Sequence, residues 1–186
     1  QISQALFSGI DWTQVKGIVA TAVEGKVSDP TARLEVRFGD HPFVPSIDPT
    51  AGLTAANISH LANLTQWVAY DSDGTGTAVT GTLAQASATQ GILTYDVDDS
   101  NANASGFAGL ISTFDDYGTV AIESEDLSAV ANFVIGLRLD DQDAGTSATG
   151  MIELVVEDAL GGKDSIFLTG VAETERFWQI SQALFS

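Results

Sequence analysis

The stretch RLEVRF at 33–38 alternates charged and apolar side chains, and MIELVV at 151–156 is a second short run rich in apolar residues. Successive side chains of a β-strand point to opposite faces of its sheet, so such runs predict strands with one face in a core. Similar runs bounded by Gly, Asp, Asn and Thr predict further strands at 15–23, 64–70, 78–84, 91–96, 107–113, 118–123, 133–139 and 164–171. We therefore predict an all-β fold, an antiparallel β-sandwich formed as one large or two small sandwiches.

Two features qualify this prediction. Short helical turns are expected before some strands, at 2–6, 58–64 and 127–133. The polar stretch 84–90 is a possible boundary between two halves, although an ordinary loop explains it equally well.

Composition excludes several classes of partner. The chain has 186 residues and is 44% hydrophobic and 17% charged, which is enough apolar material for a folded core. Acidic residues outnumber basic ones 25 to 7, and the net charge of −18 repels nucleic acids and anionic membranes but attracts cations. No apolar run reaches the roughly 18 residues that span a bilayer. We expect neither nucleic-acid binding nor membrane insertion.

An exact internal repeat sets the organisation of the chain. The segment QISQALFS at 1–8 recurs without change at 179–186, a spacing of 178 residues. Self-similarity at a fixed spacing is typical of tandem arrays. Residues 1–186 are therefore predicted to be one 178-residue period plus the first eight residues of the next. Neighbouring copies of the same unit are the expected partners.

Acidic residues gather in three predicted turns. DSDGT at 71–75 contains Asp71 and Asp73, DVDDSNAN at 96–103 contains Asp96, Asp98 and Asn101, and DDQDAG at 140–145 contains Asp140 and Asp143. Calcium prefers six to eight oxygen ligands, which alternate carboxylates in a turn can supply together with carbonyl and amide groups. Asp and Asn also favour turns through local hydrogen bonds alone. Calcium binding and simple turn formation both remain open.

The second half of the chain resembles a known family. FVIGLRLDDQDAG at 133–145, MIELVV at 151–156 and GGKDSIFLTG at 161–170 are similar to the cadherin-like and VCBS-type repeats of giant bacterial surface adhesins. The resemblance implies calcium-stiffened β-sandwiches with an extracellular, cell-surface role as adhesive modules or spacers. It also implies that Asp140, Asp143, Asp158 and Asp164 are calcium ligands. The first half of the chain departs from the family's pattern, because Glu24-Gly25 and Asp40-His41 stand where its fuller acidic turns would be expected.

Three functions fit these features. The first is a structural or adhesive repeat of a long extracellular protein. The second is a filament subunit assembled by strand donation, in which one terminus completes a neighbour's sheet. The third is a calcium-dependent module that binds surface glycans through Trp12, Trp67 and Trp178. We expect no enzyme, because His41 and His60 are the only imidazoles and no nucleophile motif accompanies either.

Overall fold

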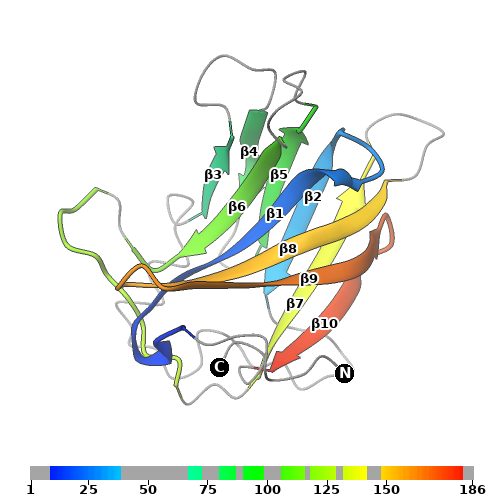
Figure 1. The fold of residues 1–186 in the computed structure, drawn as a ribbon. Helices are drawn as coiled ribbons and strands as arrows, with labels where there is room; N and C mark the ends of the chain where they lie inside the picture. Colours follow the sequence, from blue (N-terminus) through cyan, green and yellow to red (C-terminus); the bar gives the residue numbers. More distant parts are fainter. Residues whose placement is uncertain are drawn as a thin grey trace.

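The chain folds as two antiparallel five-stranded sheets that pack face to face, as the computed structural model shows (Figure 1). The structure describes residues 9–38, 67–72, 80–86, 90–98, 106–115, 118–128, 132–141 and 148–181. The predicted all-β sandwich is confirmed. No helix within these ranges is long and apolar enough to cross a membrane.

Sheet A has the strand order β3-β6-β1-β8-β9. Its strands are β1 (Val15–Val27), β3 (Trp67–Asp71), β6 (Phe107–Thr113), β8 (Thr149–Asp158) and β9 (Lys163–Ala172). Sheet B has the order β10-β7-β2-β5-β4. Its strands are β2 (Thr31–Phe38), β4 (Thr80–Ala86), β5 (Gln90–Asp96), β7 (Asn132–Asp140) and β10 (Arg176–Ser181).

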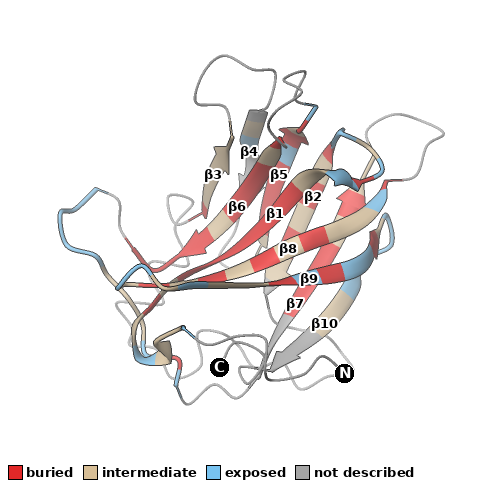
Figure 2. Cartoon of the chain, in the orientation of Figure 1, coloured by how far each residue is buried: buried red, intermediate tan, exposed pale blue. Residues whose placement is uncertain are grey.

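The core lies between the sheets and is built from alternate residues of each strand. Leu34 and Val36 of the RLEVRF stretch are almost fully buried, whereas Arg33, Glu35 and Arg37 face outward on the opposite side of sheet B. β8 follows the same rule, with Ile152, Leu154 and Val156 in the core, and Figure 2 shows buried residues running along both sheets. Each fully buried Leu, Ile or Val contributes roughly 1.5–3 kcal/mol by leaving water. This repeated alternation stabilises one continuous core.

Most predicted strands are confirmed, with two differences. Residues 118–123 form no strand, and their apolar side chains Val120 and Ile122 are exposed. Their short apolar run therefore enters no core, which is why the prediction of a strand was wrong. The structure also adds β10, which the pattern did not reveal.

The helical turns are placed differently from the predictions. Residues 2–6 and 58–64 lie outside the described residues, and Asn132 and Phe133 belong to β7 rather than to a helix. Instead, a 3-10 turn at Trp12–Gln14 precedes β1, capped by the Asp11 carboxylate, which accepts a hydrogen bond from the Thr13 N–H. A short helical turn before a strand is thus present at one unpredicted position.

The stretch 84–90, considered as a boundary, falls where two paired strands meet. β4 ends at Ala86, β5 begins at Gln90, and the two strands pair with one another in sheet B. Strands from before and after this stretch occur in both sheets.

The described chain enters and leaves the sandwich at the same end. The short connection between Val27 and Thr31 makes β1 and β2 run in opposite directions, so β1 begins at the end where β2 finishes. β7 begins beside the end of β2, with Phe38 opposite Ile135, and β10 finishes beside the start of β7, with Ser181 opposite Asn132. Val15 and Ser181 therefore lie at one end, the lower end in Figure 1, which we call the entry pole.

Candidate functional site

The outward face of sheet B is a network of paired charges. Asp140 pairs with Arg33 and, at 3.1 Å, with Arg138, while Glu35 lies 3.5 Å from Arg33 and 3.8 Å from Arg138. Burial acts to raise the pKa of Asp140, but the hydrogen bonds from Arg33 and Arg138 outweigh it and leave that pKa lowered. These acidic and basic side chains therefore neutralise one another within the face.

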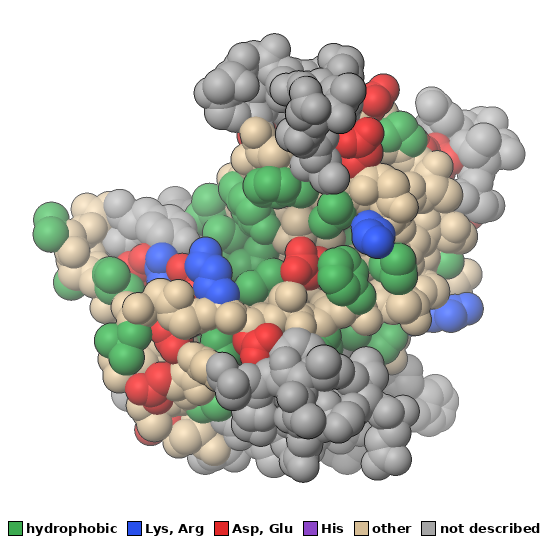
Figure 3. All heavy atoms as spheres, in the orientation of Figure 1, with side chains coloured by type: hydrophobic (Ala, Val, Ile, Leu, Met, Phe, Trp, Pro, Cys, Tyr) green, Lys and Arg blue, Asp and Glu red, His purple; other side chains and the backbone are tan. Residues whose placement is uncertain are grey.

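The outward face of sheet A is different, because it is mostly apolar. The strand register places Val68, Ile111, Val19 and Val155 in one row across four neighbouring strands. The next row of this face is Tyr70, Gly109, Thr21, Glu153 and Phe167. Figure 3 looks onto this face and shows hydrophobic side chains gathered over its middle.

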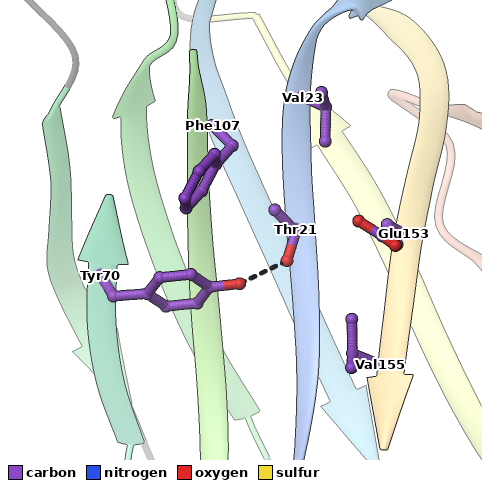
Figure 4. A pocket seen from close by; sticks show the side chains of 6 residues that line it. All are labelled: Thr21, Val23, Tyr70, Phe107, Glu153 and Val155. Carbon is purple, nitrogen blue, oxygen red and sulfur yellow. Dashed lines mark hydrogen bonds between the residues drawn. The ribbon is translucent and has the colours of Figure 1, made fainter. Parts of the chain in front are cut away.

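A hollow of about 340 Å³ opens in this face. Six side chains from four strands line it: Thr21, Val23, Tyr70, Phe107, Glu153 and Val155 (Figure 4). Its volume lies at the lower end of the range for pockets that hold small molecules. The hollow is therefore the candidate functional site of the described chain.

A glycine makes room for the ring that forms one wall of the hollow. A Cβ at Gly109 would lie 2.2 Å from Tyr70 Cε1, so the Tyr70 ring occupies the space that any other side chain at 109 would fill. The ring crosses β6, and its hydroxyl forms a 2.6 Å hydrogen bond with the Thr21 hydroxyl of β1 (Figure 4). Phe107 lies beside it, with 5.9 Å between ring centroids and a 55° tilt.

The environment of Tyr70 keeps its hydroxyl protonated. Burial raises the pKa of the phenol, and although the Thr21 hydrogen bond lowers it, the negative charges of Glu153 and Glu157 raise it further. The phenol is thus a neutral, fixed group over the whole physiological range.

No family, curated protein or solved structure matches this chain. Its function is therefore inferred from its own repeat and its own geometry.

The predicted calcium ligands are spread over several turns. Asp73, Asn101 and Asp143 lie outside the described residues. Asp71 accepts a hydrogen bond from the Gly81 N–H at 2.9 Å, and Asp96 accepts one from the Asp98 N–H at 3.0 Å. These contacts are those of turn- and strand-fixing carboxylates.

Asp158 has a structural role at the β8–β9 hairpin. Its side chain is buried, and its two oxygens accept hydrogen bonds from three backbone N–H groups: Leu160 at 2.9 Å, Gly162 at 2.7 Å and Asp11 at 2.9 Å. Asp164 accepts one from the neighbouring Ser165 N–H at 2.8 Å. Asp158 thereby joins the hairpin to the segment that leads into β1.

Metal binding at these positions stays a prediction. Within the described ranges, no three acidic or histidine side chains are grouped as a metal site requires. Three of the nine predicted ligands and both histidines, His41 and His60, lie outside those ranges.

The tryptophans pack with the core. Trp67 is 2% exposed, and Trp12 and Trp178 are partly buried against the core cluster. The Trp67 ring therefore has no open face on which a sugar could stack.

The sequence contains one signal for the hollow, which the strand predictions did not use. Residues 18–23, IVATAV, are apolar or small at nearly every position rather than alternating. A strand with that composition is covered on both faces. In the structure Ile18, Ala20 and Ala22 face the core, and Thr21 and Val23 line the hollow.

Proposed function

We propose that the chain is one folded unit of a tandemly repeated extracellular protein, in which the sandwiches act as spacers or adhesive modules. The observation that supports this most directly is the position of the repeated segment. Residues 179–181, the first three of its second copy, form the last half of β10 and pair with residues 132–134 of β7. A unit thus extends past the point where the sequence begins to repeat.

This position assigns each copy of the segment to a unit. By equivalence, Gln1, Ile2 and Ser3 would complete the β10 of a preceding unit, and residues 4–14 would connect that strand to the next β1. The end of this connection is fixed on its own unit. The Leu127 N–H donates to the Trp12 carbonyl and the Ala159 N–H to the Gln14 carbonyl, each at 2.8 Å. Consecutive units would therefore be closely connected.

The entry pole affects the shape of such an array. In a straight rod, each module receives the chain at one end and passes it on at the other. Here β1 begins and β10 finishes at the same pole, so successive units would be joined pole to pole and project sideways from their connections. With a net charge of −18, neighbouring units repel one another unless cations intervene, and calcium at the acidic turns would fill that role.

The coding sequence on either side of the chain tests this proposal. We expect further units at a spacing close to 178 residues, with an equivalent of the RFW at 176–178 directly before Gln1. A start codon shortly before Gln1 and a stop codon directly after Ser186 would refute the array.

One observation also favours the strand-donated filament. β10 lies at the edge of sheet B, and half of it consists of a segment that the chain carries twice. The copy at residues 1–3 could replace residues 179–181 beside β7 of another molecule. Size-exclusion chromatography distinguishes the two: donation predicts oligomers that disappear when residues 1–8 are deleted, whereas the covalent array predicts the same monomer with and without them.

A further inference from the structure

The hollow of sheet A combines apolar walls with one unmatched charge. Val23, Val155 and the rings of Tyr70 and Phe107 supply the walls. Glu153 lies among them, in register with Thr21, and its side-chain carboxylate has no hydrogen bond or ion pair with any residue that the structure describes. A half-buried carboxylate in such surroundings gains free energy when a cation reaches it.

The neighbouring carboxylate on the same strand is already neutralised. Glu157 lies 3.5 Å from the Lys16 ammonium and 3.3 Å from the Lys163 ammonium. Lys16 is in turn 3.6 Å from Asp115. Among the groups of this face, Glu153 is therefore the one whose charge a ligand would match.

The aromatic walls favour the same sign of charge. The faces of tyrosine and phenylalanine rings carry partial negative charge, and they attract ammonium groups that lie within about 6 Å. Two tilted rings 5.9 Å apart line the hollow on one side of β1, and Glu153 lines it on the other side (Figure 4). A cation held in the hollow would therefore lie between the rings and the carboxylate.

The small number of polar groups argues against a sugar. A saccharide needs several hydrogen-bond partners for its hydroxyl groups. The hollow offers the Glu153 carboxylate and the hydroxyls of Tyr70 and Thr21, and those two hydroxyls already bond to each other. A ligand with one charged group on an apolar body fits these walls better than a sugar does.

We propose that the hollow on the outward face of sheet A binds a small organic cation, an ammonium group carried on an apolar body, with Glu153 as its counter-ion and Tyr70 and Phe107 as its aromatic walls. Such binding adds a ligand site to the module and does not depend on whether the units form a covalent array. Tyr70 is held in place for it by the Thr21 hydrogen bond and by the space above Gly109.

The test compares choline with 3,3-dimethylbutan-1-ol, a neutral molecule of the same shape. Binding to the 186-residue protein is measured by chemical-shift changes in two-dimensional NMR spectra at low salt. We expect choline to bind at millimolar concentration or below, with shifts at residues lining the hollow, and at least 5-fold more tightly than the alcohol. Glu153→Gln keeps the side-chain shape and should weaken choline binding by about 5- to 10-fold. The expected loss is modest because an ion pair that is not fully buried contributes little free energy.

Two matched variants complete the experiment. Glu173→Gln removes the same charge from the exposed turn after β9 and should leave choline binding unchanged. Phe107→Leu keeps an apolar wall without the ring and should weaken choline binding about 3-fold while leaving the alcohol unaffected. The proposal is overturned by equal affinity for choline and the alcohol, or by equal effects of the Glu153 and Glu173 variants. No choline binding at 50 mM, a concentration at least about ten times the expected dissociation constant, would also overturn it.

Discussion

Asp158 is the position where structural and metal-binding roles can be separated most cleanly. Its carboxylate accepts hydrogen bonds from the N–H groups of Leu160, Gly162 and Asp11 within a buried site. Asp158→Ala removes all three. Because the three hydrogen bonds are part-buried, we take about 1–1.5 kcal/mol for each, at or below the low end for a charged acceptor, so the free energy of unfolding should fall by about 3–4.5 kcal/mol. For a chain of this size, that corresponds to a melting temperature lower by roughly 6–18 °C.

The assay is urea unfolding followed by tryptophan fluorescence, once with EDTA and once with calcium chloride. Asp164→Ala is the control, because that carboxylate accepts its hydrogen bond from the adjacent Ser165 and should cost less than about 1 kcal/mol. The loss at Asp158 should be the same with either additive. A loss below about 1 kcal/mol, or equal losses for both variants that appear only with calcium, would refute the structural role.

Two further predictions follow from packing and charge. Gly91→Ala places a Cβ 2.4 Å from Trp67 Cε3, and this overpacking of a buried ring should destabilise the protein by about 1–3 kcal/mol in urea unfolding, whereas Gly9→Ala, with no heavy atom within 4 Å of the new Cβ, should be neutral. Asp140 has a lowered pKa, so its contribution to stability is present above the ordinary pKa of a carboxyl group and is lost as pH falls through its folded value. Acid titration of unfolding should therefore show a shallower loss of stability below about pH 4 for Asp140→Asn than for the wild type, and parallel curves would contradict the Arg33–Asp140–Arg138 network.

Periodicity was sufficient to predict the class of fold but not every strand. RLEVRF alternates because Leu34 and Val36 enter the core, and that pattern is readable without the structure. Residues 118–123 also contain a short apolar run, yet Val120 and Ile122 are exposed, so such a run alone did not establish a paired strand. β10 was missed because its sequence, RFWQIS, places apolar residues side by side and the pairing with β7 is long-range.

The hollow could not be assembled from the sequence. Its residues come from strands that are up to 134 positions apart, Thr21 and Val155 being the extremes, and only the register of sheet A brings them together. For Asp158, the resemblance to adhesin repeats implied a calcium ligand, which stays a prediction, whereas its backbone N–H partners could not be read from the sequence. Asp favours turns because it accepts backbone N–H groups, and the structure shows three of them at this residue.

A paired deletion tests the central proposal, that the folded unit depends on the second copy of QISQALFS, through residues 179–181 of β10, and not on the first copy. Deleting residues 179–186 removes half of β10 and its pairing with residues 132–134, which should lower the free energy of unfolding by about 2 kcal/mol and the melting temperature by roughly 4–8 °C. Deleting residues 1–8 removes the same eight residue types and should leave the melting temperature of the single unit unchanged. Equal losses from both deletions, or a loss from the N-terminal deletion alone, would contradict this assignment of the repeat.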